Sequence, residues 1–310
     1  MMAMFALIIA VSITSPAAQT PAFGAASGQV TGIGGKHLAG QGAGAAHGNP
    51  VWCHVRGAGP AQRGRVSTSP PDPSGQLMPV GNLPGWTQVF ADDFTKDVPL
   101  GSFPAAVSGK WTAYPDGWHD TSGNGTYQPS KVVSIRNGVM NLHLHTQNGI
   151  HMVAAPVPII PGAPGRAGGL LYGRFAVRFK ADRVPGYKTA WLLWPDSNRW
   201  ADGEIDFPEG GLTGTISAFM HYKGNPRAQD AYLTGATYNT WHTAVIKWAP
   251  RAVTFLLDGR VIGSSTNPAT IPSTPMHWVL QTETQLSGGP PANSAAGNVQ
   301  IDWVTAYKRS

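Results

Sequence analysis

Three acidic residues fall within six positions of the chain, in the segment 203–210 with the sequence GEIDFPEG. Side chains alternate between the two faces of a β-strand, so Glu204 and Asp206 share one face and the apolar residues between them face the other. Strict alternation sends Glu209 to the opposite face, unless one extra residue is accommodated as a β-bulge. Pro208 lies where that bulge would form and has no N–H to lose from the ladder. The spacing therefore predicts three carboxyl groups in a row on one face.

A row of carboxyl groups suits nucleophilic and acid–base chemistry at a sugar. Glycosidic cleavage with retention needs two carboxyl groups about 5–5.5 Å apart, and the long side chains of Glu204 and Glu209 can lean toward each other to reach that separation. A third carboxyl between them raises the proton affinity of its neighbours, which helps one glutamic acid stay protonated while the other is ionised. A solvated edge strand and a Ca²⁺ site are the two alternative interpretations of the same residues.

From Trp86 onward, the residue pattern of the chain is that of a β protein. Alternating apolar and polar residues predict short strands at 131–136, 139–145, 171–180, 252–257, 260–264 and 299–303. An Asn-Gly pair joins the first two of these strands and an Asp-Gly pair joins the fourth and fifth, which predicts tight hairpin turns. No convincing helical period is present. The pattern predicts an all-β fold with two packed antiparallel sheets.

The acidic segment resembles the signature of glycoside hydrolase family 16, in the bulged form typical of laminarinase-like members. That signature runs Glu, apolar residue, Asp, two residues, Glu. The resemblance covers almost all of 86–310. Its further landmarks, in order, are VFADDF at 89–94, LYGRFAVRFK at 171–180, AWLL at 190–193, Trp200, the stretch from Trp241 through Asp258-Gly259, and the strand 299–307.

This resemblance implies a concanavalin-like β-jelly roll with a concave substrate cleft, and an endo-acting retaining β-glycosidase. The expected partner is a polysaccharide, with β-1,3-glucan or mixed-linkage β-1,3-1,4-glucan favoured by the bulged signature. Carried over by position, Glu204 is the nucleophile, Glu209 the general acid/base, and Asp206 the residue that orients and tunes the nucleophile. Double displacement by these residues requires no cofactor. The alternatives are an endo-galactanase or a transglycosylase on the same fold, and a lectin-like carbohydrate-binding protein.

Several other residues are candidates for contacts with a sugar. Indole rings stack on the flat apolar faces of sugars, so we expect Trp200 and Trp191 to contact substrate, with core packing as the alternative. The polar candidates are His221 on the strand after the acids, Asn124 in a Gly-Asn-Gly turn, Arg174 in the Tyr-Gly-Arg strand and Gln281 in the strand 278–284. The resemblance also implies a structural Ca²⁺, with Asp302 at the family's ligand position near the C-terminus.

The net charge of +6 does not indicate a nucleic-acid partner, because it is spread along the chain. Residues 21–85 contribute +3 and the rest of the chain contributes +3, with no dense block of Lys or Arg. Cys53 is the single cysteine, which excludes an intrachain disulfide and a multi-cysteine zinc site.

The N-terminal part of the chain predicts export. An apolar run at 4–13, followed by small residues, is typical of a signal peptide over 1–25, and it is too short to span a bilayer. Residues 26–85 hold many Gly and Pro residues without apolar periodicity, which predicts a flexible linker. We therefore expect a secreted or cell-wall-associated monomer, without a membrane span when mature, whose catalytic domain is 86–310.

Overall fold

The computed structural model describes residues 72–161 and 168–310. The predicted signal peptide, Cys53 and most of the predicted linker lie outside the described residues. Within the described part, no helix is both long and apolar enough to cross a bilayer. The helices there are short: α1 (Pro129–Val132) and two 3-10 turns, η1 (Ala105–Val107) and η2 (Trp200–Asp202).

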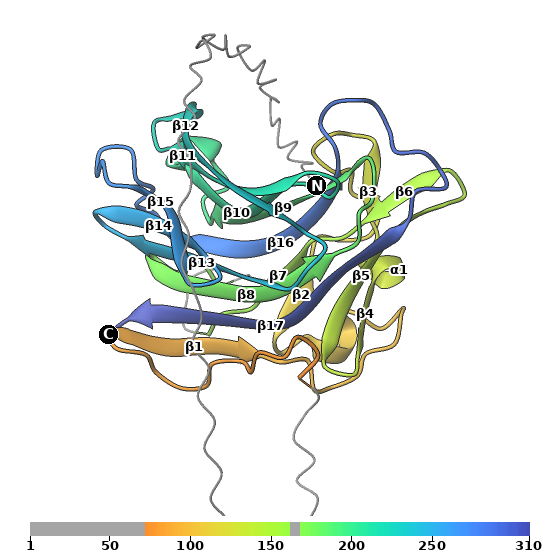
Figure 1. Cartoon of the computed structure of the whole chain (residues 1–310), viewed down its shortest axis with the longest axis horizontal. Coiled ribbons are helices and arrows are strands. Elements are labelled where there is room, and N and C mark those ends of the chain that lie inside the picture. The colour runs from red at the N-terminus through yellow and green to blue at the C-terminus, as the bar shows by residue number, and fades with distance from the viewer. Residues whose placement is uncertain (1–71, 162–167) are drawn as a thin grey trace, which may run out of the picture. The chain divides into compact units, whose positions relative to one another are not determined.

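Strands make up most of the described chain, and Figure 1 labels them in order. Their bounds are β1 (Trp86–Asp92), β2 (Trp111–Ala113), β3 (Gly125–Tyr127), β4 (Val133–Arg136), β5 (Val139–Gln147), β6 (Ile150–Val153), β7 (Pro156–Pro158), β8 (Gly173–Ala181), β9 (Tyr187–Pro195), β10 (Glu204–Gly211), β11 (Thr215–Tyr222), β12 (Asn225–Thr237), β13 (His242–Ala249), β14 (Ala252–Leu257), β15 (Arg260–Ser265), β16 (Met276–Thr284) and β17 (Gly297–Arg309).

Two large sheets form the two layers of the domain (Figure 1). The five-stranded sheet has the order β12-β11-β10-β9-β16, and its concave face points away from the other sheet. The ten-stranded sheet follows the path β15-β14-β13-β8-β17-β5-β6-β3, with β1 added to β17 and β4 to β5. All pairs in the five-stranded sheet are antiparallel. The all-β jelly roll predicted from the sequence is confirmed.

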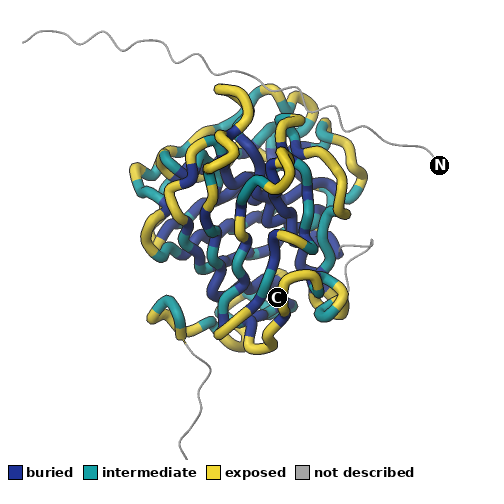
Figure 2. The backbone as a smooth tube through the Cα atoms, turned by 90° about the vertical axis from the view of Figure 1, so that its right-hand side faces the viewer, coloured by how far each residue is buried: buried dark blue, intermediate teal, exposed yellow. Residues whose placement is uncertain are grey.

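The hydrophobic core lies between these two sheets. The apolar residues of β8 point into it, and Phe179 packs edge-on against Trp191 of β9 with ring centroids 5.2 Å apart. Phe175 meets Trp278 of β16 in the same way, at 5.4 Å. Large aromatic side chains bury much apolar area and favour such edge-to-face contacts. Figure 2 shows the result, with the inner strands buried and the connecting turns exposed.

Both predicted hairpins are confirmed, and their turns have the backbone geometry that tight hairpins require. Asn137 and Gly138 between β4 and β5 have φ values of 53° and 78°, and Asp258 and Gly259 between β14 and β15 have 50° and 79°. Two successive residues with positive φ match the right-handed twist of the flanking strands. Alternation along β5 buries Met140, Leu142 and Leu144 completely.

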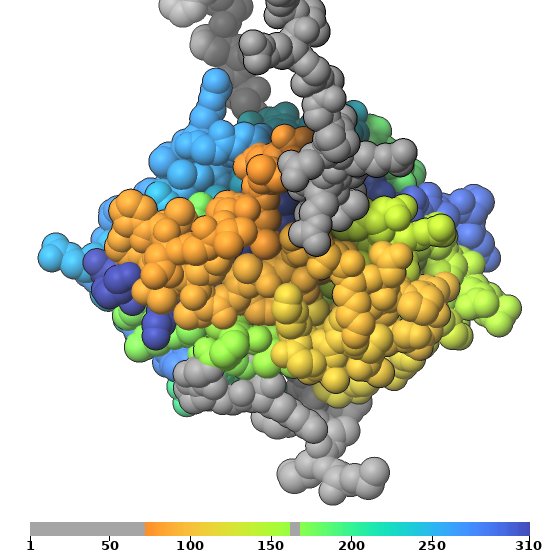
Figure 3. All heavy atoms as spheres, turned by 90° about the horizontal axis from the view of Figure 1, so that it is seen from below, coloured from red at the N-terminus to blue at the C-terminus, as the bar shows by residue number. Residues whose placement is uncertain are grey.

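The predicted boundary at Trp86 differs from the structure, because residues 72–85 already contact the domain. Trp303 of β17 donates its indole N–H to the Gln76 carbonyl at 2.8 Å, and Arg178 of β8 donates to Ser74. Met78 packs on a small apolar cluster on the outer face of the ten-stranded sheet. The segment and β1 form much of the face seen in Figure 3, coloured orange. These contacts are made by backbone groups and single side chains. They therefore leave no apolar periodicity in the sequence from which they could be predicted.

Candidate active site

The acidic segment is β10, the central strand of the five-stranded sheet, and it carries the predicted bulge. Asp206 pairs with Phe219 of β11 and Glu209 pairs with Ser217, so three steps along β10 match two steps along β11. The pairing with β9 has the same offset. Pro208 lies inside this irregular stretch. The extra residue returns Glu209 to the face of Glu204 and Asp206, so the predicted alignment of the three carboxyl groups is confirmed.

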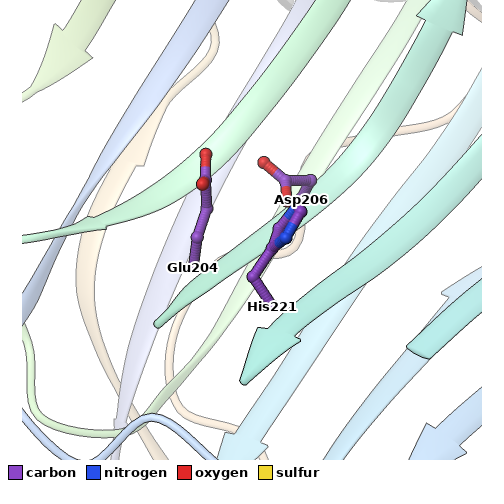
Figure 4. Close-up of side chains that lie close together, drawn as sticks. All are labelled: Glu204, Asp206 and His221. Carbon is purple, nitrogen blue, oxygen red and sulfur yellow. Dashed lines mark ion pairs between the residues drawn. The ribbon is translucent and has the colours of Figure 1, made fainter. Parts of the chain in front are cut away.

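Packing beneath β10 fixes these side chains. Ile205 and Phe207 point into the core, and the Phe207 ring meets Phe255 of the opposite sheet with centroids 5.7 Å apart. Figure 4 shows Glu204 and Asp206 standing on the same side of β10, with His221 of β11 beside them. Neighbouring strands pair with β10 on both sides, so the three side chains rise from a rigid element.

Glu204 accepts a hydrogen bond from Trp200, whose Nε1 lies 2.7 Å from Oε2. Trp200 sits in η2, four residues before Glu204, and its ring lies 5.7 Å from that of His221. Burial, followed by the charge of Asp206, raises the pKa of Glu204, whereas His221 and the indole bond oppose the rise. An indole N–H can only donate, so this bond favours the ionised form of Glu204. Trp200 therefore lies beside the acids, and its contact with a sugar remains a prediction.

A proton must lie between Asp206 and its neighbours. His221 Nδ1 is 2.8 Å from the Pro226 carbonyl, which can only accept, so Nδ1 carries a hydrogen. Nε2 of the same ring lies 3.5 Å from Asp206 Oδ2, and that contact needs either a protonated Asp206 or a doubly protonated His221. Burial and then the charge of Glu209 raise the pKa of Asp206. The pKa of Glu204 is raised as well, by burial and then by Asp206, so both carboxyl groups favour holding a proton.

Glu209 is paired with a lysine that sequence reasoning missed. Lys188 of β9 places Nζ 2.7 Å from Glu209 Oε1 and 4.0 Å from Glu283 Oε2 of β16. Burial lowers the pKa of Lys188, but Glu209 and Glu283 outweigh burial and the net change is a rise. Glu283 also accepts from Thr121 and from the Tyr127 hydroxyl. The available signal was a lysine inside the apolar run of β9, because a buried charge needs a partner.

Two of the predicted sugar-binding residues lie elsewhere, so those predictions are wrong. Trp191 is fully buried and packs on Phe179, because its neighbours Ala190 and Leu192 are the residues of β9 that share the face of the acids. Arg174 belongs to β8 of the other sheet. Its guanidinium lies over the Tyr307 ring, 5.2 Å from the centroid, and among the described residues it makes no ion pair with a carboxylate.

Gln281 and Asn124 lie on or beside the face of the acids. Gln281 of β16 pairs with Ala190 of β9, which in turn pairs with Glu209, so all three share one face. Asn124 is exposed in a loop that Asp120 fixes to the end of β16, by accepting from the backbone and hydroxyl of Thr284. Their contacts with a sugar remain predictions, as does that of His221.

Two aromatic residues at the edge of the site were not predicted. Tyr114 is close enough to the acids that burial, Glu204 and Glu283 together raise its pKa. Trp118 is 59% exposed, and its ring lies 6.0 Å from that of Tyr114. No local pattern separates such a residue from a core tryptophan, because only the folded loop brings it to the site.

Metal binding can be considered at two places. Within the described residues, Glu204, Asp206 and His221 offer ligand atoms within 4.8 Å of one another. At Asp302, burial raises the pKa, Ser74 bonds to the carboxyl, and Oδ2 is buried without a partner. That orphaned oxygen fits a Ca²⁺ ligand, and Ca²⁺ binding there remains a prediction.

Replacing Trp200 with Phe tests the bond to Glu204. The ring is kept and the N–H is lost, and a hydrogen bond to a charged group is worth about 1.5–3 kcal/mol. We expect kcat/KM on the substrate identified below to fall about ten- to a hundredfold. Trp241→Phe is the matched control, because Trp241 contacts Lys180 on the other sheet. Equal rates for the two variants would show that the indole bond does not assist Glu204.

Comparison with known proteins agrees with this fold and site. The solved structure of SCLam, a non-specific endo-beta-1,3(4)-glucanase from family GH16, aligns with a TM-score of 0.60 and 19% identity, over 75% of this chain and 95% of that one. The laminarinase catalytic domain from Thermotoga maritima MSB8 aligns with a TM-score of 0.58 and 17% identity, over 73% and 99%. These likenesses establish the fold as the jelly roll of such enzymes.

The sequence comparisons point to one family of glycoside hydrolases. The family model for glycosyl hydrolases family 16 matches residues 167–305, which include β10 and its three acids. Crh-like protein 2 of Aspergillus fumigatus is 28% identical over 148 residues, covering 43% of this chain and 32% of that protein. The match thus spans about a third of that curated relative. Over residues 167–305 the domain is therefore similar to glycosyl hydrolases family 16.

Proposed function

We propose that this protein is a retaining endo-β-glycosidase. The observation that carries the proposal is the bulge of β10, which brings Glu204, Asp206 and Glu209 to one face. Glu204 attacks the anomeric carbon while Glu209 protonates the leaving oxygen, so the glycosidic C–O bond breaks and a glycosyl ester forms on Glu204. Glu209 then removes a proton from water, which attacks the anomeric carbon, so that the C–O bond to Glu204 breaks and the Glu204 carboxylate is released. Asp206, which lies between Glu204 and Glu209 on the same face, orients and tunes Glu204 in both steps.

The favoured substrate is β-1,3-glucan or mixed-linkage β-1,3-1,4-glucan. The bulged signature supports it, and so do the two structural neighbours, one an endo-beta-1,3(4)-glucanase and the other a laminarinase. Their identity to this chain is below 20%, so a galactan substrate is tested in the same experiment. Transglycosylation would use the same three acids and differ in how well the acceptor site excludes water.

A substrate panel tests the proposal. The purified protein is incubated with laminarin, lichenan and agarose, and release of reducing ends is measured together with product length. We expect cleavage of laminarin or lichenan into mixed short oligosaccharides, as endo action requires, and none with Glu204→Gln. Binding to these glucans without cleavage would overturn the hydrolase assignment in favour of a lectin-like protein. Cleavage of agarose alone would replace the glucan by a galactan.

Export to the medium or the cell wall is the second part of the proposal. Its support is the apolar N-terminal run and the polysaccharide substrate proposed above. A truncation that tests retention at the wall should end before residue 72, because Ser74 and Gln76 bond to the domain. Such a truncated protein should keep its activity and lose wall retention. Equal wall retention of the two forms would show that the N-terminal part does not anchor the enzyme.

A further inference from the structure

Lys188 occupies an unusual position for a charged residue. It lies in β9, where all nine residues are buried, and its side chain is only 10% exposed. Its ammonium points to the face of the acids, 2.7 Å from Glu209 and 4.0 Å from Glu283. A lysine buried in this way without a partner would be strongly destabilising, so the two carboxylates explain how the strand tolerates it.

We infer that Lys188 is a positioning residue that holds Glu209 ionised before substrate binds and passes its ion pair to Glu283 when Glu209 carries the catalytic proton. The inference rests on the proposed function, because it assigns a role to the partner of its acid/base. Both partners of this exchange are in place. The Glu209 carboxylate is in hydrogen-bond contact with Lys188 Nζ, and the Glu283 carboxylate lies 4.0 Å from the same nitrogen.

The charges around Glu209 make the position of Lys188 decisive for proton binding at Glu209. From its own strand, Asp206 and Glu204 face it, and Glu283 faces it from β16 beyond the lysine. β11 contributes the uncharged Ser217, and His221 lies farther along β11 beside Asp206. Tyr238, after β12, lies near enough that Glu209 raises its pKa, after the larger effect of burial. Among these described groups, Lys188 is the one permanent cation, so its position governs how easily Glu209 takes a proton.

The exchange has a direct consequence for the reaction. The first step needs a protonated Glu209, whereas an ammonium at 2.7 Å favours the ionised form. If Lys188 turns to Glu283, its charge stays paired while Glu209 holds a proton. After Glu209 has given that proton to the leaving oxygen, it is ionised again and the original pair re-forms. Lys188 thereby limits activity on the alkaline side, where too little protonated Glu209 remains.

Substitutions at the two ends of the exchange should move the pH profile in opposite directions. Lys188→Met removes the cation, so Glu209 keeps its proton to higher pH, and the alkaline limb of kcat/KM should move up by about one pH unit or more. Glu283→Gln removes the competing acceptor, so Lys188 stays with Glu209 and the limb should move down. Lys188→Arg keeps the charge and should restore a limb close to that of the wild type.

The pH profiles are measured on the glucan identified by the panel, with unfolding midpoints recorded for each variant. A structural role alone would lower rates and midpoints without moving the limb in opposite directions. An unmoved alkaline limb in folded Lys188→Met would overturn the inference. If that variant does not fold, Lys188→Met with Glu283→Gln removes both charges, and its limb should still move up; an unmoved limb would again overturn the inference.

A readout without turnover separates this inference from the proposed function. The Glu209 carboxyl is followed by carbon NMR of Glu-labelled protein against pH, with Glu209→Gln to assign its signal. We expect the Glu209 titration to move to higher pH in Lys188→Met, and no movement would overturn the inference. A wild type inactive on every glycan, with this titration shift present, would refute the proposed function and leave the ion-pair exchange standing.

Discussion

Glu204→Gln is expected to abolish glycan cleavage while the domain stays folded. The amide has the shape of the carboxylate and can keep a bond from Trp200 Nε1, but it cannot form the glycosyl ester. We expect kcat to fall on the order of a thousandfold or more, the scale seen when a covalent enzyme loses its nucleophile. Initial rates of reducing-end release on the active glucan give the measurement. A variant rate within about tenfold of the native rate would contradict the nucleophile assignment.

The stability of the same variant provides the control. Burial raises the pKa of Glu204 in the folded protein, so the folded state loses stability as pH rises through that value and the group becomes charged. Gln carries no charge, and this part of the pH dependence should disappear. Unfolding midpoints of Glu204→Gln should therefore equal or exceed those of the wild type at neutral pH. A much lower midpoint would mean that lost activity reflects unfolding.

Asp206→Asn is expected to cause a loss of about a hundredfold in kcat, the scale of removing one group that stabilises a transition state, together with a changed pH profile. Asp206 shares a proton with its neighbours and is almost fully buried, and its pKa is raised by burial and by Glu209. Asn cannot release that proton, so the limb of the profile that reports Asp206 should vanish. The measurement is kcat/KM against pH for both proteins.

An exposed acid supplies the matched control for this second variant. Asp97 follows β1 and accepts from the backbone of Asn137, far along the chain from β10. Asp97→Asn should leave both the rate and the pH profile at wild-type values. An unchanged profile in Asp206→Asn would show that Asp206 is not coupled to the catalytic pair, even if the rate fell.

The parts of the structure that the sequence predicted are those that depend on local rules. Alternation along a strand placed Glu204 and Asp206 on one face, and a proline in the right position indicated the bulge that returns Glu209 to it. Asn-Gly and Asp-Gly pairs specified two hairpins, because few other residues adopt positive φ in succession. Trp200 lies beside Glu204 because it precedes that residue by only four positions in the chain.

The failures depend on pairings between distant segments. The run around Trp191 is continuously apolar, so alternation could not show whether Trp191 or Leu192 shares the face of the acids, and only the register with β10 decides it. The alternation in 171–180 places Arg174 on the polar face of its strand. Nothing local shows that this strand, β8, belongs to the other sheet. The pairing of Lys188 with two acids depends on β9, β10 and β16 lying side by side, so the sequence alone could not show it.

Trapping the glycosyl-enzyme is the most direct test of the central claim that Glu204 and Glu209 flank one anomeric centre. The protein is incubated with an activated 2-deoxy-2-fluoro β-glucoside oligomer, digested and analysed by mass spectrometry. We predict one sugar per protein, attached through an ester to Glu204, with hydrolysis of the ester slowed in a Glu209→Gln background. A label on another residue, or products released with inverted anomeric configuration and no label at all, would contradict the mechanism.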